Sequence, residues 1–535
     1  MNSATQNSQP QPAASARYKV LLGAIIVQLI LGTVYGYSIF WKPLASEIFP
    51  PVITEAQKAE MQAAGKNVGG MTVVADKAAA DNQTKINQGY LKYAFSICIL
   101  SFAAVMVIAG RVQDLKGPRF PAIVGAILMA MGFLFAGFMN SPIVFYIAHA
   151  AFAGVTTIVL LMLYHAIMGN VDLSQAPMRR SIPMGIVTAV IVAGVVLANE
   201  YVGKLGEWDK LFLLWGTVGF LAGAGIGFAY VCPIAALVKW FPQHKGLVSG
   251  LAVAGFGFGA YFFKGDPYII SADWFSVPIP GAQGFSKVFG IRTLFLVHGL
   301  VALVGISAGA MLLRNPPGVA KAAGAGADST WQDTLRRPVF YVLWLMFFSG
   351  AMAGLMVIGI VQPFVADQLT AAKLDAAAAL KIGAAAVGYL AIFNALGRVV
   401  WGLVSDRIGR TTAFVAMFTI QAVVMFTLGH LDTATALCVG AGAVGFNFGG
   451  NFALFPSATA DLFGAKNLGA NYGWVFTSYG IAGVVGIAAG NEAIKRTGSY
   501  AAAFTVAAVL CLLSAALAVA LRFIPKPAPV PKLAS

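Results

Sequence analysis

Long apolar runs alternate with short polar segments along most of the chain. Fourteen runs of about 18 residues or more lie near 18–41, 89–110, 120–139, 142–169, 181–203, 211–238, 247–270, 291–313, 338–365, 383–403, 411–429, 434–458, 468–490 and 500–523. A run of this length matches the roughly 30 Å hydrocarbon core of a bilayer. It must be helical there, because lipid offers no hydrogen-bond partner to a free backbone group. The pattern predicts an all-α polytopic membrane protein with about 14 transmembrane helices.

Composition narrows the class of protein. Apolar residues make up 59% of the 535 residues and charged residues 10%, against about 25% charged in soluble domains. A soluble enzyme, a disordered regulator and a secreted disulfide scaffold are therefore excluded, and the four cysteines, all in apolar runs, are expected to be free thiols. Residues 1–16 lack the basic start and apolar core of a cleaved signal, so the first span is expected to stay attached.

The charges predict which way the chain crosses the membrane. An even number of spans puts both termini on one side. With the termini inside, the inner segments hold 19 Lys and Arg and 6 Asp and Glu, whereas the outer segments hold 15 and 14. This excess predicts cytoplasmic termini and accounts for the net charge of +15 without nucleic acid. The expected location is a plasma membrane, taken to be a bacterial inner membrane. Arg398 belongs to neither surface.

Two landmarks occur twice in the chain. Gly110-x3-Asp114-x2-Gly117-x-Arg119 returns as Gly402-x3-Asp406-x2-Gly409-Arg410, 292 residues later. The stretch from Pro233 to Gly250 returns from Pro456 to Gly473, 223 residues later. Such internal repeats are typical of transporters. Because the offsets differ by 69 residues, the first half contains an insertion as long as a helical hairpin.

The repeat predicts six helices in each half plus one added hairpin. Its expected parts, in chain order, are an N-terminal tail 1–17, a first six-helix bundle 18–313 with an outer loop 50–88 and an inserted hairpin 140–208, a central cytoplasmic loop 314–337, a second bundle 338–523 and a C-terminal tail 524–535. The hairpin carries His149 and His165. Contact with a neighbouring helix or the interface is favoured over proton transfer for both, because an added hairpin normally packs outside the core.

These motifs resemble the major facilitator superfamily, and within it the oxalate/formate antiporter family. The resemblance rests on GRVQDLKGPR (110–119), residues 227–260, AGLMVIG (353–359), FNALGRVVWGLVSDRIGR (393–410) and residues 445–483. It implies carboxylate transport through a central cavity by alternating access. It also implies that the two loop motifs close the cytoplasmic side. The gating residues expected on this basis are Asp114, Arg119, Asp406, Arg407 and Arg410.

Arg398 is the leading candidate for substrate binding. It lies eight residues before Asp406, or roughly 12 Å along a helix from the cytoplasmic loop. A guanidinium at that depth is costly unless it faces water or an anion, and its planar fork fits a carboxylate. The resemblance agrees, because the substrate arginine of the family matches Arg398. The alternative is a structural arginine that reaches carbonyl groups or the interface.

The repeat and the resemblance suggest a substrate with one charge. Met106 stands at the repeat position of Arg398, so the first half has no second arginine. Oxalate-binding members carry a lysine where this chain has Tyr479, so a monocarboxylate such as formate, lactate or pyruvate is preferred over oxalate. The repeat places Phe256 opposite Tyr479. Further lining residues implied by the resemblance are Tyr35, Tyr37, Tyr230, Phe448, Phe452 and Phe476.

The mode of coupling stays open between anion exchange and proton-coupled transport. Related monocarboxylate carriers place an Asp where this chain has Asn394, which does not titrate. Proton coupling would therefore need His298, Lys264, Asp266 or the substrate to carry the proton. The alternatives are an oxalate/formate antiporter and a non-transporting sensor on the same scaffold. An enzyme is not expected, nor are a cofactor, a metal site or an obligatory oligomer; the partners are the carboxylate and the lipid bilayer.

Overall fold

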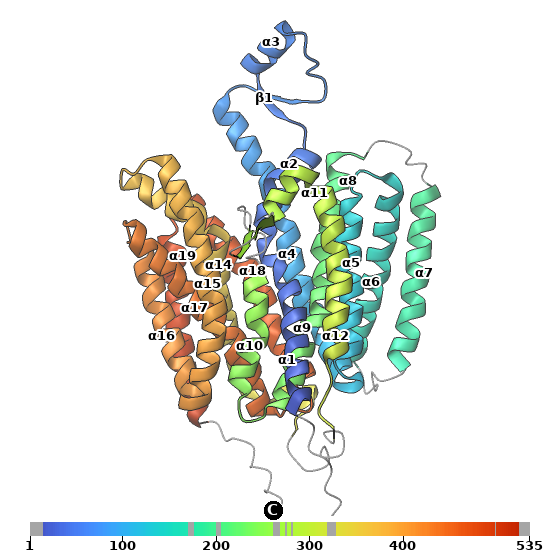
Figure 1. Ribbon diagram of the computed structural model, residues 1–535, viewed down its shortest axis with the longest axis vertical. Helices are drawn as coiled ribbons and strands as arrows, with labels where there is room; N and C mark the ends of the chain where they lie inside the picture. Colours follow the sequence, from blue (N-terminus) through green and yellow to red (C-terminus); the bar gives the residue numbers. More distant parts are fainter. Residues whose placement is uncertain are drawn as a thin grey trace, which may run out of the picture.

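A computed structural model describes residues 14–168, 176–198, 205–259, 268–272, 275–279, 282–317, 328–497 and 499–523. It is a bundle of long helices (Figure 1). We call the end of the bundle where the first helix begins the lower end. The upper end is the opposite one, from which α3 and β1 project (Figure 1). Residues 1–13 of the expected tail 1–17, the expected tail 524–535, the side chain of His165, and the positions Lys264 and Asp266 lie outside the described residues. Residues 14–17 of the expected tail belong to the first helix.

The first half combines regular helices with three irregular ones. Its helices and strands are α1 (Ala14–Leu31), the 3-10 helix η1 (Gly32–Phe40), α2 (Trp41–Ile48), β1 (Val52–Thr54), α3 (Glu55–Ala63), β2 (Thr72–Val74), α4 (Lys77–Lys116), α5 (Arg119–Gly137), α6 (Pro142–Met168), α7 (Ala176–Ala198), α8 (Glu207–Leu214), the π-helix η2 (Trp215–Leu221), α9 (Ala222–Trp240), α10 (Lys245–Phe258), β3 (Tyr268–Ala272), β4 (Phe275–Ile279), α11 (Ala282–Val301), the π-helix η4 (Ala302–Ile306) and α12 (Ser307–Leu312). The stretch α8–η2–α9 forms one continuous span.

The second half consists of long helices. They are α13 (Trp331–Arg336), which lies in the segment joining the halves, then α14 (Pro338–Ala371), α15 (Ala376–Ile408), α16 (Arg410–Leu428), α17 (Ala434–Phe463), α18 (Leu468–Thr497), α19 (Ala501–Ala520) and the 3-10 turn η6 (Leu521–Phe523). Side-chain caps by Asp76, Asp375 and Thr433 begin α4, α15 and α17. Gly117, Gly409 and Gly464 follow α4, α15 and α17 with φ of 81°, 85° and 89°, a conformation that favours glycine.

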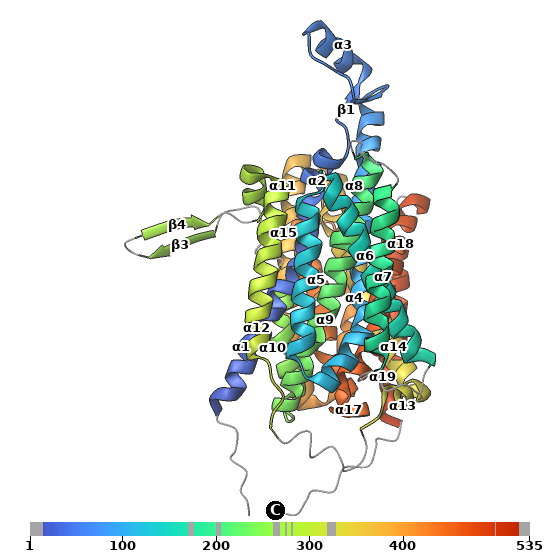
Figure 2. The same ribbon diagram turned by 90° about the vertical axis from the view of Figure 1, so that its right-hand side faces the viewer.

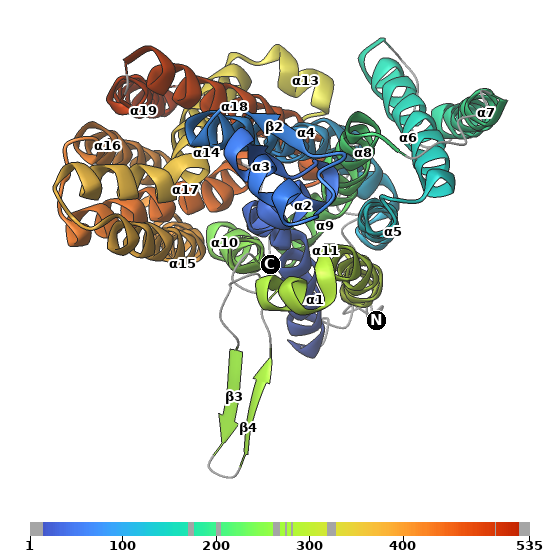
Figure 3. The same cartoon turned by 90° about the horizontal axis from the view of Figure 1, so that it is seen from above.

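The all-α membrane fold is confirmed, whereas the number of spans is not. Among the described residues, twelve helical segments are long and apolar enough to cross a membrane. The apolar stretches Ser181–Ala193 of α7 and Lys245–Phe258 of α10 are shorter. Fourteen spans therefore stay a prediction. Seen from above, α6 and α7 lie at the outer edge of the first half (Figure 3).

Two predicted boundaries are wrong. The run 247–270 is not one helix, because α10 ends at Phe258 and residues 268–270 already belong to β3. Strands β3 and β4 are rich in β-branched and aromatic residues. They pair antiparallel, with Tyr268 opposite Ile279, and project sideways from the bundle (Figure 2). The outer loop is also shorter than 50–88, because α4 begins at Lys77; the parallel pair β1–β2 and α3 precede it.

Candidate functional site

Arg398 lies at the contact between the two halves. It is 0% exposed on α15. Its Nε donates to Asn394 Oδ1 (2.9 Å), and its Nη1 donates to the carbonyl oxygen of Val253 on α10 (2.8 Å). Its Nη2 is buried without a hydrogen-bond partner among the described residues. Both acceptors are neutral, and the buried carboxylates of Asp114 and Asp406 pair with Lys239 and Arg410 instead. Among the described residues the positive charge of Arg398 therefore stays uncompensated.

An aromatic cluster surrounds this guanidinium. Its members come from both halves and pack with ring centroids 4.8–6.4 Å apart; they are Tyr35, Phe102, Tyr230, Phe256, Phe347, Phe452, Phe476 and Tyr479. The guanidinium carbon lies 4.4 Å from the ring centroid of Phe452 and 5.6 Å from that of Phe256. Ring faces attract a cation at such distances. They stabilise the charge of Arg398 without neutralising it.

Two tyrosines of the cluster join the halves. The hydroxyl groups of Tyr35 and Tyr479 lie 2.8 Å apart and share a hydrogen bond. The Tyr230 ring is fully buried, and its hydroxyl oxygen forms no hydrogen bond within the described structure. The cluster can therefore offer hydroxyl groups and one cation to a small anion.

The structure brings together most of the lining residues expected from the sequence. Phe448 touches the edge of the cluster through Phe452, with ring centroids 5.1 Å apart. Tyr37 does not join it: its ring stacks on Phe95, and its hydroxyl donates to the carbonyl oxygen of Leu91. A cavity of about 320 Å³ beside α6 and one of about 720 Å³ beside α15 and α17 are both lined by residues other than Arg398. Arg398 itself is closed off from solvent, because none of its surface is exposed.

Three aromatic residues in or beside this cluster were not predicted from the sequence. Phe102 sits at the repeat position of Asn394, 292 residues earlier, so the repeat carried the signal that could have found it. Phe347 is one of 38 phenylalanines, and nothing in its span distinguishes it. Tyr472 is fully buried, and its ring centroid lies 5.6 Å from that of Phe476. It precedes Tyr479 on α18 by seven residues, or about two helical turns.

The repeated aspartates close the lower end of the bundle by contacts between the halves. Asp114 accepts hydrogen bonds from the backbone N–H groups of Gly469 (3.1 Å) and Ala470 (2.8 Å) at the start of α18. Asp406 likewise accepts from Gly246 (2.9 Å) and Leu247 (2.8 Å) at the start of α10. Free N–H groups and the helix dipole make a helix start favourable for a carboxylate.

Glycines allow these helices to approach so closely. A Cβ on Gly110 would lie 2.0 Å from the carbonyl oxygen of Gly469, and one on Gly402 would lie 2.3 Å from that of Gly246. Glycine is therefore required at both crossings. Each G-x3-D motif packs against the repeated glycine motif of the opposite half.

Basic residues reinforce this lower end unequally. Lys239 Nζ lies 3.7 Å from Asp114 within the first half. In the second half Arg410 pairs with Asp406 (2.6 Å) and Asp461 (3.0 Å), and Asp461 also receives Lys245 of α10 at 2.7 Å, which links the two halves. The other two predicted gating residues make no such pair: Arg119 donates to the carbonyl oxygen of Leu313, and Arg407 is exposed.

In the described part of the chain, no group of three or more His, Cys, Asp or Glu is placed to hold a metal ion. His298 is 7% exposed on α11; its Nε2 lies 3.1 Å from Thr33 Oγ1, and its ring packs edge-on against Phe133 at 4.4 Å. It is a buried titratable group in the first half.

Comparisons with known proteins agree with this architecture. The family model described as Major Facilitator Superfamily matches residues 351–535. The oxalate:formate antiporter of Oxalobacter formigenes is 31% identical over 63% of this chain and 74% of its own length. Apicoplast pyruvate carrier 1 of Toxoplasma gondii is 28% identical over 60% and 69%. The solved structure of the proton:xylose symporter XylE matches 96% of this chain and 97% of its own with a TM-score of 0.56 at 13% identity, which supports the fold alone.

Proposed function

Because the chain belongs to the major facilitator superfamily, and so is a membrane transporter rather than an enzyme, we propose that it exchanges small monocarboxylate anions by alternating access. The observation that carries the proposal is Arg398. Its buried charge is balanced by no carboxylate, and its Nη2 has no protein partner among the described residues. A buried group in this condition is costly unless a ligand completes it. A carboxylate brings both the missing charge and the missing acceptor.

The charge of the site supports a monoanion. Arg398 is the one Lys or Arg among the fully buried residues that the structure describes. A dianion such as oxalate would keep one uncompensated charge beside Arg398, unless it carried a proton. Tyr479 supplies a hydroxyl group where oxalate-binding members of the oxalate/formate antiporter family, which this sequence resembles, have a lysine. The names of the two relatives include the monoanions formate and pyruvate, and the first also includes the dianion oxalate.

Oxalate/formate exchange is the second candidate. It is favoured by one observation, the 31% identity to an oxalate:formate antiporter. On this reading the tyrosine hydroxyl groups near Arg398 would hold the second carboxylate. Transport assays with oxalate and formate loaded separately decide between the two candidates.

Exchange is proposed over proton coupling because of Asn394. In its place an aspartate would pair with Arg398 and could accept a proton, whereas the amide oxygen accepts from Nε without neutralising it. A carrier that returns empty must then reorient an unpaired buried cation, which costs several kcal/mol. A carrier that returns with an anion does not. His298, bonded to Thr33, is the described titratable group that proton-coupled transport could use.

The lower end is proposed to face the cytoplasm of a bacterial cell. The described chain begins and ends there (Figure 1), and 13 of the 15 net positive charges fall on that side by the assignment from sequence. The contacts of Asp114 and Asp406 then close the cytoplasmic entrance. The anion at Arg398 would be released to the other side after the upper helices part.

Counterflow in proteoliposomes tests the proposal. Formate, lactate, pyruvate or oxalate is loaded separately, and the wild type is compared with Arg398→Ala and Arg398→Lys. Arg522→Ala is the matched control, because Arg522 bonds Thr412 at the surface. We expect monocarboxylate counterflow that Arg398→Ala abolishes and Arg522→Ala leaves unchanged. Equal transport by wild type and Arg398→Ala would remove Arg398 from the site, and no counterflow of any anion would favour the sensor.

A further inference from the structure

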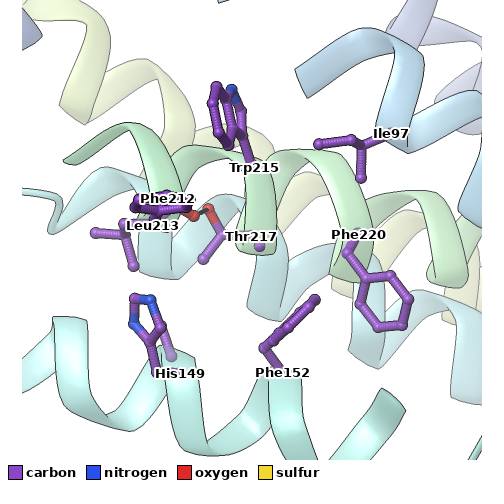
Figure 4. Close-up of a pocket in the computed structure, with 10 residues that line it drawn as sticks. Ile97, His149, Phe152, Phe212, Leu213, Trp215, Thr217 and Phe220 are labelled. Atoms are coloured by element: carbon purple, nitrogen blue, oxygen red, sulfur yellow. Dashed lines mark hydrogen bonds between the residues drawn. The ribbon is translucent and has the colours of Figure 1, made fainter. Parts of the chain in front are cut away.

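A cavity of about 320 Å³ separates the inserted hairpin from the body of the first half (Figure 4). Helix α6 forms one wall, α8 and η2 form the opposite wall, and α4 contributes Ile97. The walls are mainly aromatic and aliphatic: Ile97, Phe152, Phe212, Trp215 and Phe220 are among them. The transport site described above makes no use of this cavity.

The π-helix η2 shapes the inner wall. A π-helical turn holds more residues than an α-turn and often marks a functional site. Here it presents Trp215, Gly216 and Thr217 to the cavity. The nearest atom that a Cβ on Gly216 would meet is in the Phe152 ring, at 3.7 Å. Since that is ordinary van der Waals contact, Gly216 leaves free space rather than filling a tight crossing.

One polar ring faces this apolar space. His149 extends from α6 toward Leu213 and Thr217 (Figure 4). Its Nδ1 lies 2.7 Å from the carbonyl oxygen of Phe145 and must donate there, because a carbonyl only accepts. The Nε2 atom of the neutral ring can then only accept, and it is available to a donor outside the protein. The Thr217 hydroxyl is already used, since it donates to the Leu213 carbonyl oxygen at 2.6 Å.

The level of the cavity in the membrane is marked by aromatic side chains. Tyr93 and Trp208 are 55% and 52% exposed at the upper end, and Trp215 Nε1 donates to the Tyr90 carbonyl oxygen. Such belts lie at the membrane–water interface. His149 is seven residues below Pro142, the start of α6, which corresponds to roughly 10 Å. That is the level where lipid head groups give way to acyl chains.

The cavity also borders the bilayer. Phe212 lines it and is 53% exposed, so the wall continues onto the outer surface of a spanning segment. Apolar cavities exclude water and accept apolar ligands. The surrounding lipid is the apolar material at hand, and it carries polar groups at the level of His149.

We propose that this cavity binds one acyl chain of a bilayer phospholipid, with His149 Nε2 accepting a hydrogen bond from a head-group donor of the same molecule, the ammonium of phosphatidylethanolamine or a hydroxyl of phosphatidylglycerol. The lipid then joins α6 of the inserted hairpin to η2. The same continuous helix carries Tyr230 of the aromatic cluster and Lys239 of the lower end. The hairpin is thereby a lipid-binding addition to the transporter body, and the proposal does not depend on the identity of the transported anion.

Lipid retention by the full chain tests this site. Protein reconstituted with palmitoyl-oleoyl phosphatidylethanolamine and phosphatidylglycerol is extracted in mild detergent and examined by native mass spectrometry. Gly216→Leu fills the cavity. Gly388→Leu is the matched control, because a Cβ on Gly388 of α15 meets nothing within 4 Å. We expect one retained phospholipid in wild type and control, at least a tenfold loss in Gly216→Leu, and about a fivefold loss in His149→Leu, the effect of one hydrogen bond.

A second measurement locates the lipid. A phospholipid with a photoreactive diazirine in its acyl chain should label peptides of α6 and η2 in wild type, and this labelling should fall in Gly216→Leu. Should Gly216→Leu not fold, Ala148→Leu fills the cavity from α6 instead, since Ala148 also lines it. Equal retention in all variants, or labelling of α6 and η2 no stronger than that of the surface of α15, would overturn the proposal and identify the cavity as unoccupied packing space.

Discussion

Replacing Asn394 with Asp changes the charge of the site with almost no change of shape. The side-chain oxygen that accepts from Arg398 Nε at 2.9 Å becomes part of a carboxylate. The neighbouring guanidinium keeps that carboxylate ionised at neutral pH. Arg398 is then paired within the protein, and the site holds no net charge.

The size of the effect follows from Coulomb's law. Two unit charges about 5 Å apart interact by about 3 kcal/mol at an effective dielectric constant near 20. A substrate carboxylate bound to Arg398 would meet the new Asp at about that distance, so its affinity should fall by roughly two orders of magnitude. The empty carrier gains in return, because its cation no longer crosses the membrane interior unpaired. Exchange should slow while net flux rises.

The assay compares counterflow with net efflux of pyruvate from the same proteoliposomes. In wild type, exchange is expected to exceed net efflux by about a hundredfold or more; in Asn394→Asp the ratio should approach one. Asn394→Leu is the neutral control, since it removes the hydrogen bond without adding a charge. If Asn394→Asp and Asn394→Leu change the ratio equally, the charge of the empty site does not enforce exchange and the reasoning fails.

Three further changes probe the specificity and the lower end. Tyr479→Lys adds a second cation to the aromatic cluster and should produce oxalate counterflow; its absence with protein of normal stability would show that cation number does not select the anion. Gly402→Leu should clash with the carbonyl oxygen of Gly246, 2.3 Å from a Cβ there, and lower exchange at least tenfold, whereas Gly388→Leu should not. Asp406→Asn weakens two charge-assisted hydrogen bonds to α10 and should raise thiol labelling of a cysteine introduced by Ser249→Cys, a fully buried position on α10, about tenfold; unchanged labelling would mean that these bonds do not hold the end closed.

The sequence predicted the repeated parts of the transporter better than their contacts. The offsets of 292 and 223 residues related Asp114 to Asp406 and Gly246 to Gly469. They could not reveal that each aspartate bonds the glycine motif of the other half, because periodicity orders elements along the chain and not across an interface. The predicted span 247–270 failed for a related reason: hydropathy does not distinguish an apolar strand pair from the continuation of a helix.

The cluster around Arg398 shows the same limit at the level of single residues. Tyr35 and Tyr37 are two positions apart, and both were expected in the site. They lie on the 3-10 helix η1, where two residues correspond to two thirds of a turn. Tyr35 therefore faces Tyr479 while Tyr37 faces Phe95. Nothing in GTVYGYSIF indicates this geometry in advance, nor does WGTVGFL indicate the π-helix η2.

The arrangement of α15 links the closed lower end to the charge of the site. Arg398, Gly402 and Asp406 follow one another at intervals of four residues, so they share a ridge of the helix. All three contact α10: through the Val253 carbonyl oxygen, through the close approach to Gly246, and through the N–H groups at the start of α10. Parting α15 from α10 at the lower end must therefore also draw Arg398 away from Val253 and release Nη1.

The matching ridge of the first half carries no charge at that level. On α4 it holds Met106, Gly110 and Asp114, which meet α18 at Gly473 and Gly469. Movement between α4 and α18 leaves no buried cation unpaired, whereas movement between α15 and α10 frees Nη1 beside Nη2, which already has no partner in the described structure. An anion that binds these nitrogens stabilises the parted arrangement more than the closed one, and a ligand shifts an equilibrium only through such a difference. The single arginine thus makes the contact between α15 and α10 the one through which a bound carboxylate can drive the opening.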